Sequence, residues 1–384
     1  MDQETDSVPG SPTPLTWYAR PAARTWTCAP PTPDARAFHA SLPGYAPTPL
    51  HELPALATAF GVSRVFVKDE SSRLGLPAFK ALGASWAIDR ILARHANSTP
   101  QATGARPLRL VTATDGNHGR AVARTAGQLG LRAHVFVPDG VHCAAAAAIE
   151  AEGAEVTVVA GSYDVAVRAA KAAAGAPDTV LVQDMAWDGY EEIPSLIVGG
   201  YETLFAEVDD QLDAAGVRSP SMVAVPVGVG SLAQAAVTHY RGGPPAQSSP
   251  DPTPPAPPAL LSVEPVGAAC VLESLLAGRL TSVPTGVTAM AGLNCGTPSA
   301  LAWPVLRDGL DAAVAVTDAD ALSAMRGLTD LGVPSGPCGA ASSAGVRAAL
   351  TGAGSGERRA ALGIGPEATV ALISTEGAAA NPWL

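Results

Sequence analysis

The stretch LRLVTATDGNHGRAVARTAGQLG, residues 108–130, holds the pattern that decides the fold. An apolar run of strand type comes first, a turn containing Gly and Asn follows, and a helical pattern then ends at Gly130. A strand, a short turn and a helix in this order make one unit of a parallel sheet. Such a turn presents backbone N–H groups to an anion, so the carboxylate of Asp115 inside it needs a separate explanation.

Similar units lie on both sides of this stretch. Apolar runs alternate with helical patterns of about ten residues or more, which indicates parallel strands covered by helices on both faces. The expected strands are 64–69, 108–113, 132–138, 155–160, 179–184, 222–228, 260–265 and 369–375. We therefore predict an α/β fold with two parallel αβ units. Ligands of such sheets bind at the carboxyl ends of the strands, so the turns TDGNHG, GVGS and STEG are expected to face one cleft.

The chain length favours two domains. We expect a small αβ domain at 84–190 and a large domain made of 37–83 and 191–384. Residues 1–36 are rich in Pro, Thr and Ala and are expected to form an irregular arm. The Pro-rich residues 241–259 are expected to be a disordered insert on the surface of the large domain.

Composition excludes several classes of partner. The 384 residues carry a net charge of −11 without a Lys/Arg cluster, which argues against nucleic acid. Uninterrupted apolar runs stay short of 18 residues, so we expect no membrane span. The five cysteines are scattered and neither they nor the histidines have metal-ligand spacing, so we predict no metal site and reduced thiols in the cytoplasm. The N-terminus is acidic and has no apolar signal-peptide region.

Two segments carry recognisable chemistry. Lys80 stands in the apolar, Gly-bounded segment GLPAFKALG at the start of a helical pattern, where desolvation would lower its pKa and make it a good Schiff-base nucleophile. The segment PVGVGS, residues 226–231, is a strand followed by a glycine loop and a helix start, which suits an anion. Read with Ala233 it also resembles a dinucleotide fingerprint, with Glu264 on a ribose hydroxyl. An NAD-dependent oxidoreductase is therefore a rival hypothesis.

Taken together, the motifs resemble those of the diaminopropionate ammonia-lyases, which are fold type II pyridoxal-phosphate (PLP) enzymes. The resemblance spans about residues 38–377 in order. The segments that carry it include GLPAFKALG, TDGNHGR, VQDMAWDGYEEIP, VPVGVGS, MAGLNCGTPS and ISTEG. It implies two αβ subdomains with the cofactor in the cleft between them, and a homodimer.

The resemblance also implies a role for each matching residue. Lys80 would hold the cofactor covalently, and Asp115 would act as a second base. Asn117 would donate a hydrogen bond to the phenolic oxygen of the cofactor, and Ser374 would lie near its pyridine nitrogen. The residues expected to hold the cofactor phosphate are Gly228, Val229, Gly230 and Ser231. The residues expected to contact the substrate are Thr114, Asp115, Gly116 and His118.

The implied reaction is elimination of ammonia from D- or L-2,3-diaminopropionate to give pyruvate and a second ammonia. Lys80 would take the α-proton of the L-isomer, and Asp115 that of the D-isomer. Two departures keep alternatives open: Pro337-Cys338 replaces an acidic stretch of the family, and Pro77 stands where Asn is common. A serine or threonine dehydratase, or a β-replacement enzyme of secondary metabolism, is the alternative. Cys338 is a pocket candidate without an assigned role.

Overall fold

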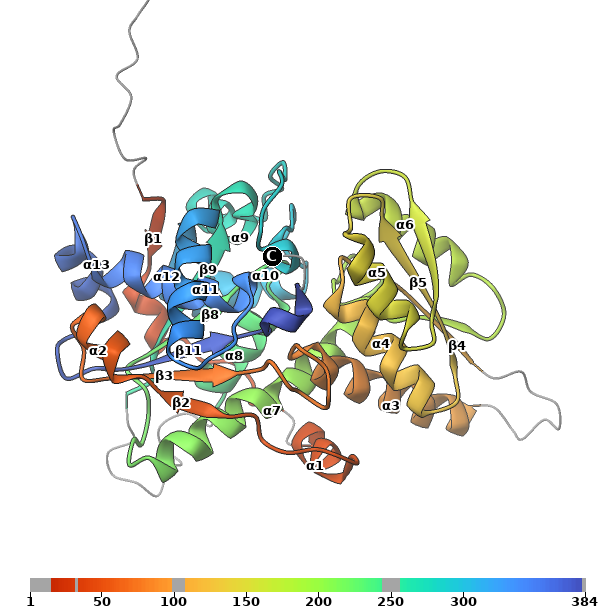
Figure 1. Cartoon of the computed structure of the whole chain (residues 1–384), viewed down its shortest axis with the longest axis horizontal. Helices are drawn as coiled ribbons and strands as arrows, with labels where there is room; N and C mark the ends of the chain where they lie inside the picture. Colours follow the sequence, from red (N-terminus) through yellow and green to blue (C-terminus); the bar gives the residue numbers. More distant parts are fainter. Residues whose placement is uncertain (1–14, 32–33, 99–107, 244–255, 382–384) are drawn as a thin grey trace, which may run out of the picture.

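The computed structural model describes residues 15–31, 34–98, 108–243 and 256–381. Within these residues the chain forms two units side by side, each built on its own β-sheet with helices packed against it (Figure 1). The larger sheet has seven strands and the smaller has four. The α/β class predicted from the alternating patterns is confirmed.

The larger sheet is parallel except at its two edges. Its strands, in order across the sheet, are β1 (Trp17–Ala19), β10 (Ala312–Val316), β9 (Ala259–Pro265), β8 (Met222–Pro226), β11 (Thr369–Ser374), β3 (Arg64–Asp69) and β2 (Leu50–Glu52). The five central strands pair in parallel, and β8 to β11 are buried along their whole length. The edge strands β1 and β2 pair antiparallel with their neighbours, so the sheet is mixed and not purely parallel as expected. Three residues are too few to give a periodic signal in sequence.

The smaller sheet is parallel throughout. Its strands, in order, are β6 (Glu155–Val159), β5 (Arg132–Pro138), β4 (Arg109–Ala113) and β7 (Thr179–Leu181). All four lie at the positions predicted from apolar runs. The helix after β4 ends at Gln128, and Gly130, two residues later, has φ +67°, which is the left-handed conformation expected of a glycine after a helix C-terminus.

Helices cover both faces of each sheet. The α-helices are α1 (Asp34–Ser41), α2 (Pro54–Phe60), α3 (Lys80–Ser98), α4 (Asn117–Gln128), α5 (Cys143–Glu150), α6 (Tyr163–Ala173), α7 (Glu192–Ala214), α8 (Ser231–Arg241), α9 (Cys270–Ala277), α10 (Ala302–Gly309), α11 (Asp318–Asp330), α12 (Pro337–Leu350) and α13 (Ser355–Leu362). Short 3₁₀ helices are η1 (Pro21–Thr25), η3 (Val266–Ala268), η4 (Ala291–Leu293) and η5 (Ala378–Ala380). One apolar core runs from α3 and α4 to α7 and α8 and joins the units, and a second lies under α2 and α12 on the other face of the larger sheet.

The contact between α3 and α7 fixes the start of α3. A Cβ atom on Gly83 would lie 2.6 Å from the ring of Tyr201, and one on Gly200 would lie 2.6 Å from the carbonyl oxygen of Leu82. Both positions therefore require glycine, and the two helix backbones approach closely. Lys80 is the first residue of α3, so this packing sets where its side chain begins.

Two sequence expectations fall on the chain ends and the insert. Within the arm expected to be irregular, β1 and η1 are ordered, and β1 pairs with β10. Most of the Pro-rich insert, residues 244–255, lies outside the described residues, and β9 begins at its far end.

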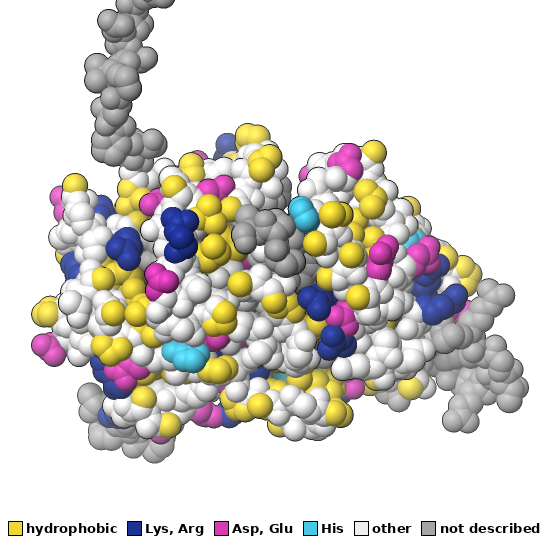
Figure 2. Space-filling model, in the orientation of Figure 1, with side chains coloured by type: hydrophobic (Ala, Val, Ile, Leu, Met, Phe, Trp, Pro, Cys, Tyr) yellow, Lys and Arg dark blue, Asp and Glu magenta, His cyan; other side chains and the backbone are white. Residues whose placement is uncertain are grey.

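Among the described helices, none combines the length and apolarity needed to cross a bilayer. On the face shown in Figure 2, acidic and basic side chains are interspersed.

Candidate active site

A pocket is lined by residues of both units. The three glycine-containing turns predicted to share a cleft all contribute to its walls. Its lining comes from residues 114–118, 226–232, 291–293 and 375–376, together with Phe79, Lys80, Ala145, Tyr163, Asp184, Cys295, Cys338, Ala380 and Asn381. The carboxyl ends of β4, β8 and β11 lead into it, which is where ligands of parallel sheets bind.

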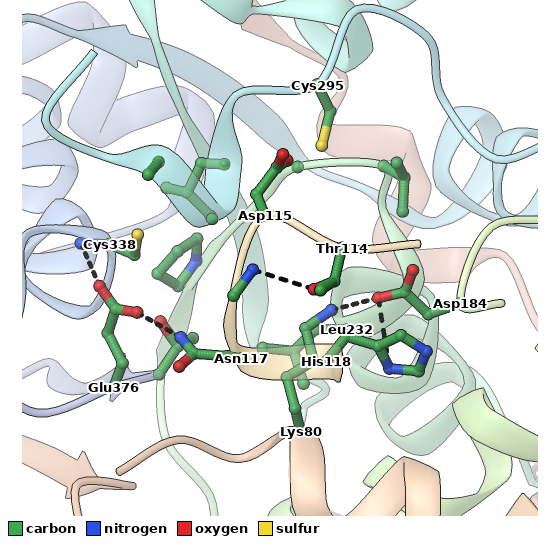
Figure 3. A pocket seen from close by; sticks show the side chains of 18 of the residues that line it. Lys80, Thr114, Asp115, Asn117, His118, Asp184, Leu232, Cys295, Cys338 and Glu376 are labelled. Atoms are coloured by element: carbon green, nitrogen blue, oxygen red, sulfur yellow. Dashed lines mark hydrogen bonds and ion pairs between the residues drawn. The ribbon is translucent and has the colours of Figure 1, made fainter. Parts of the chain in front are cut away.

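Lys80 enters this pocket from the start of α3. Its Nζ donates a hydrogen bond to Asp184 Oδ2 at 2.6 Å, and the lysine side chain is one-fifth exposed (Figure 3). Burial alone would lower the pKa of Lys80, but the Asp184 carboxylate outweighs it and holds the pKa above the usual range. The expectation that desolvation lowers the pKa of Lys80 is therefore wrong for this structure, because it took no account of a neighbouring acid.

Asp115 lies on the turn after β4 and lines the same pocket. Its side chain points toward the thiol of Cys295 (Figure 3). Burial, helped by the negative charge of Asp184, raises the pKa of Asp115 to about 7, while Lys80 opposes the shift. A carboxylate with a pKa near neutrality is well matched to accept a proton at physiological pH.

Asp184 connects three parts of the site. It follows β7 and pairs with Lys80, and its Oδ2 lies 3.9 Å from Nδ1 of His118. Burial would raise the pKa of Asp184, but His118 and Lys80 hold it below the usual range, so the group stays ionised. His118 is buried, and its Nε2 lies 2.8 Å from the Val182 carbonyl oxygen, to which it donates. Burial lowers the pKa of His118, so its imidazole is held neutral.

The turn after β4 is held in shape by Thr114. Its Oγ1 accepts hydrogen bonds from the backbone N–H groups of Gly116 and Gly119, at 2.9 and 3.1 Å. A Cβ on Gly119 would clash with the side chains of Thr114 and Val135. The turn residues expected to contact substrate, 114–116 and 118, all line the pocket. The hydroxyl proton of Thr114 is not used in these two hydrogen bonds and can be donated to a ligand.

The loop at 228–231 forms the opposite wall, at the N-terminus of α8. Gly230 has φ +100°, and a Cβ there would lie 2.6 Å from Leu306 Cδ1. The first hydrogen bond of the helix runs from Gln234 N–H to the Gly230 carbonyl, so the N–H groups of residues 231–233 have no acceptor within the helix. Ser231 donates its hydroxyl to the backbone oxygen of Asp184 at 2.8 Å. The loop thus offers free N–H groups at the positive end of a helix.

Ser374 differs from the other predicted site residues. It is fully buried, its Oγ donates to Ser335 Oγ at 2.8 Å, and it does not belong to the described residues that line the pocket. A Cβ on Gly339 would lie 2.7 Å from both hydroxyls, so the start of α12 passes directly over them. Thr375 and Glu376, the two residues directly after β11, do line the pocket.

The residues of the rival nucleotide-binding hypothesis serve another purpose. Glu264 is fully buried and accepts hydrogen bonds from the backbone N–H groups of Val271 and Leu272, at 2.8 and 2.7 Å. Burial raises the pKa of Glu264 to about 8. The glutamate therefore caps the start of α9 and is not available to bind a ribose, which removes the acid that the dinucleotide fingerprint requires.

Comparison with known proteins agrees with this geometry. The sequence profile of the family described as "Pyridoxal-phosphate dependent enzyme" matches residues 41–375. The chain is 40% identical over 309 residues to the diaminopropionate ammonia-lyase of Salmonella typhimurium strain LT2, covering 76% of this chain and 74% of that protein. It is 36% identical over 360 residues to the enzyme of Escherichia coli K12, covering 89% and 87%.

This chain belongs to the diaminopropionate ammonia-lyase family of PLP-dependent enzymes. Solved structures agree with this assignment. The crystal structure of the E. coli lyase in complex with an aminoacrylate-PLP azomethine reaction intermediate superposes with a TM-score of 0.81 at 33% identity, covering 94% of each chain. The complex of the same lyase with D-serine gives a TM-score of 0.81 at 32% identity.

The pocket of this family member fits pyridoxal phosphate in three respects. Lys80 places a primary amine inside it, which is the group that binds an aldehyde. The α8 N-terminus presents free N–H groups suited to a phosphate. A Cβ on Gly228 would lie 3.0 Å from Cys295 Sγ, so a side chain on that glycine would fill the space beside the loop.

Several residues of the pocket were not predicted as site residues, although three of them lie in segments that carry the family resemblance. They are Asp184, Glu376, Cys295 and Tyr163. Asp184 and Glu376 have a local signal, because each is a polar residue shortly after an apolar strand, at the edge where ligands bind. Burial raises the pKa of the Cys295 and Cys338 thiols, which keeps both protonated. The described residues contain no group of three or more His, Cys, Asp or Glu side chains that could hold a metal ion.

Proposed function

We propose that this protein is a PLP-dependent ammonia-lyase that converts 2,3-diaminopropionate and water into pyruvate and two molecules of ammonia. The observation that carries the proposal is the arrangement of Lys80, Asp115 and Asp184 in one pocket of a chain from the diaminopropionate ammonia-lyase family. Its relatives named above carry that activity in their names.

We assign the cofactor to residues of both walls. Lys80 Nζ would hold its aldehyde carbon, and the loop Gly228–Ser231 would receive its phosphate at the start of α8. Asn117, at the first turn of α4, would donate to its phenolic oxygen. Bound there, PLP supplies the electron sink that makes the α-hydrogen of an amino acid acidic.

Two bases at different positions could serve the two stereoisomers. The amine of Lys80, when not bonded to the cofactor, would accept the α-proton of the L-isomer. In the D-isomer that proton points to the other side, and we assign its removal to Asp115, which has a pKa of about 7. A base must reach its proton within hydrogen-bond distance, and both groups line the pocket.

The charge of the pocket suits a substrate with a second amine. Asp184 is held ionised and Asp115 is half-ionised near neutral pH, so both can attract the β-ammonium group of diaminopropionate. A serine hydroxyl in the same position would gain no such attraction. Loss of the β-amino group as ammonia leaves an enamine, which water hydrolyses to pyruvate and the second ammonia.

The test compares substrates side by side on the purified protein. Pyruvate formation is measured with D-diaminopropionate, L-diaminopropionate, serine and threonine, in the wild type and in Lys80→Ala. We expect both diaminopropionate isomers to react at least tenfold faster than serine, and the variant to lose both activity and cofactor absorption. Faster reaction with serine or threonine would identify a dehydratase instead, and a wild-type protein without cofactor absorption would contradict the proposal.

We further propose a homodimer located in the cytoplasm, with two domains divided as 37–83 plus 191–384 and 84–190. The support for the domain boundaries is that β4 to β7 all come from the second range, while β2, β3 and β8 to β11 come from the first. Analytical ultracentrifugation of the purified protein would test the dimer.

A further inference from the structure

Glu376 is a buried acid on the wall of the pocket that faces α4, and the function proposed above assigns it no role. It comes two residues after β11 and is 3% exposed. Its Oε2 accepts a hydrogen bond from Nδ2 of Asn117 at 2.6 Å (Figure 3). The two residues are 259 positions apart in sequence and belong to different units of the fold.

The other carboxylate oxygen of Glu376 has two donors of its own. Oε1 accepts from Nδ2 of Asn381 at 2.7 Å and from the backbone N–H of Cys338 at 3.3 Å. Cys338 is the second residue of α12, so the acid also faces the positive end of a 14-residue helix. Three N–H donors on one carboxyl group favour its ionised form, which accepts only. Burial opposes this and raises the pKa of Glu376.

The backbone around Glu376 is anchored on both sides, which fixes the point from which its side chain reaches Asn117. Its carbonyl oxygen accepts from Gly336 N–H at 2.9 Å, and the residue forms a β-bridge with Ala78, two positions before Lys80. A Cβ on Gly336 would lie 2.9 Å from Glu376 Oε1. The space around the carboxylate is therefore closed by glycine on one side and by Asn117 on the other.

We propose that Glu376 is a positioning residue that fixes the side-chain amide of Asn117 with its nitrogen, not its oxygen, toward the cofactor site. The inference rests on the proposed function, in which Asn117 donates to the phenolic oxygen of the cofactor. An amide nitrogen has two N–H groups. Glu376 takes one, which sets the plane of the amide and leaves the second N–H to donate into the pocket.

Without the acid, the amide can rotate by half a turn at little cost. The oxygen of Asn117 would then face the phenolic oxygen, and two acceptors would oppose each other. Because an ionised carboxylate can only accept, Glu376 excludes that orientation in a way that a neutral amide cannot. Charge-assisted hydrogen bonds are also about twice as strong as neutral ones.

A double-mutant cycle on the full-length holoenzyme tests this role. The cofactor dissociation constant is measured by equilibrium dialysis, together with the visible absorption spectrum, for the wild type, Glu376→Gln, Asn117→Ala and the double variant. We expect each single variant to weaken cofactor binding about tenfold, the size of one lost hydrogen bond to a charged or polar group. The double variant should bind within about twofold of Asn117→Ala, because Glu376 acts only through Asn117.

Glu202→Gln is the matched control, since it makes the same change in another buried glutamate with a raised pKa that does not line the pocket. It should leave cofactor affinity within about twofold of wild type. If it weakens binding as much as Glu376→Gln, or if the two effects multiply in the double variant, Glu376 has a general structural role and the inference is wrong. Unchanged cofactor binding and an unchanged spectrum in Glu376→Gln would also overturn it.

Two features keep the test decisive. If Glu376→Gln does not fold, Glu376→Asp takes its place in the cycle. This variant keeps the negative charge but shortens the side chain by one methylene, which moves the carboxylate away from Asn117. The same losses of cofactor affinity are expected. A wild-type protein that binds cofactor but yields no pyruvate from diaminopropionate contradicts the proposed function and leaves the cycle interpretable. A wild-type protein that forms pyruvate but shows a multiplicative cycle contradicts only the role of Glu376.

Discussion

Lys80 and Asp184 are 104 residues apart in the sequence, and their side chains form an ion pair of 2.6 Å inside the pocket. The pair joins the first residue of α3 to the segment that follows β7. Asp184 raises the pKa of Lys80, so the amine is stored in its charged form. A lysine must be neutral to attack an aldehyde, and Asp184, whose pKa is held low, is a poor acceptor, so the proton of Lys80 has to leave to another base or to solvent.

Asp184→Asn should lower the pKa of Lys80, because burial then acts without a compensating charge. The measurement is the pH dependence of Lys80 acylation by an amine-selective reagent in the cofactor-free protein, followed by mass spectrometry of the Lys80 peptide. The midpoint should fall by one pH unit or more, which corresponds to about 1.4 kcal/mol. Lys171, on α6, serves as an internal reference for the reactivity of the reagent. An unchanged midpoint for Lys80 would mean that the ion pair does not control its protonation.

Asp115→Asn should impair reaction of the D-isomer far more than that of the L-isomer. A general base contributes about 10²- to 10⁴-fold, so we expect kcat/KM for D-diaminopropionate to fall by at least 10²-fold and that for the L-isomer by less than tenfold. The readout is pyruvate formation from each isomer. Equal losses would show that Asp115 anchors both substrates and does not act as a stereospecific base.

If Asp115 is the base for the D-isomer, the pKa of its carboxyl group should appear in the pH dependence of kcat/KM. Burial raises it to about 7, and only the ionised form can accept a proton. In the wild type, kcat/KM for the D-isomer should therefore rise with pH up to about 7 and then level off. Asp115→Asn should abolish that rise. A wild-type profile for the D-isomer that is flat between pH 6 and 8 would exclude Asp115 as the titrating base.

The sequence predicts what depends on local pattern and misses what depends on contacts far along the chain. Apolar runs such as 64–69 match the observed strands because parallel strands are buried on both faces. Strand β10 reads AAVAV, and its alanines carry a weak strand signal, so it was not predicted. The pairing of Lys80 with Asp184 and of Asn117 with Glu376 joins residues more than one hundred positions apart, and a single sequence contains no signal for either pair.

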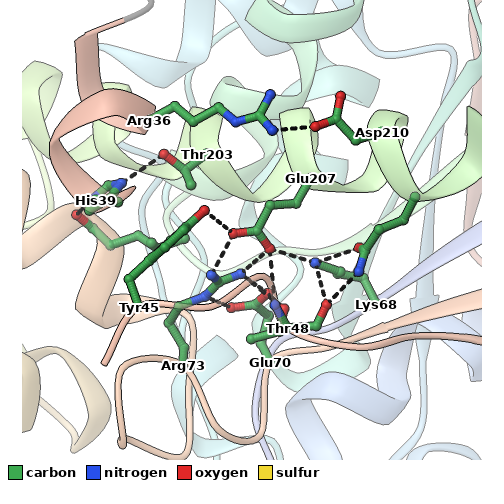
Figure 4. Close-up of polar contacts among 12 residues, drawn as sticks. Arg36, His39, Tyr45, Thr48, Lys68, Glu70, Arg73, Thr203, Glu207 and Asp210 are labelled. Carbon is green, nitrogen blue, oxygen red and sulfur yellow. Dashed lines mark hydrogen bonds and ion pairs between the residues drawn. The ribbon is translucent and has the colours of Figure 1, made fainter. Parts of the chain in front are cut away.

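Glu207→Gln should strongly destabilise the fold, because Glu207, on α7, belongs to a buried network of ion pairs (Figure 4). Glu207 accepts hydrogen bonds from Lys68 at 2.6 Å and from Arg73 at 2.7 Å, and the side chains of all three are fully buried. Glu70 balances the second positive charge. Removing one partner of such a group leaves a buried charge uncompensated and costs about 3–5 kcal/mol. Urea denaturation measures the loss.

Arg36 and Asp210 supply the matched control, because Asp210 lies on α7 like Glu207 and pairs with Arg36 of α1, but both side chains are about half exposed. Arg36→Ala should change the free energy of unfolding by less than about 1 kcal/mol. Lys68 and Arg73 overcome burial and hold the pKa of Glu207 at about 2, so its stabilising effect is complete above about pH 4.5 and is lost as the pH falls toward 2. The wild type should lose stability over that range more steeply than Glu207→Gln. Equal stability of Glu207→Gln and Arg36→Ala would contradict the prediction.

Gly230→Ala should weaken both the fold and the phosphate site. Gly230 has φ +100° directly before α8, and a side chain there would also displace Leu306 from α10. Forcing an L-residue into a left-handed conformation costs about 1–2 kcal/mol. The protein can relieve that strain only by turning the loop, and this moves the N–H groups at the start of α8 away from the phosphate. We therefore expect cofactor affinity to fall by at least tenfold.

Gly278→Ala separates backbone strain from the effect on the site. Gly278 follows α9 with φ +67°, and a Cβ there would meet no atom within 4 Å. Both alanine variants should lower the free energy of unfolding by about 1–2 kcal/mol, because each loses a glycine at positive φ. Only Gly230→Ala should raise the cofactor dissociation constant, since only its loop opens onto the pocket. If the two variants bound cofactor equally well, the glycine at 230 would serve the fold alone and the phosphate would have to lie elsewhere.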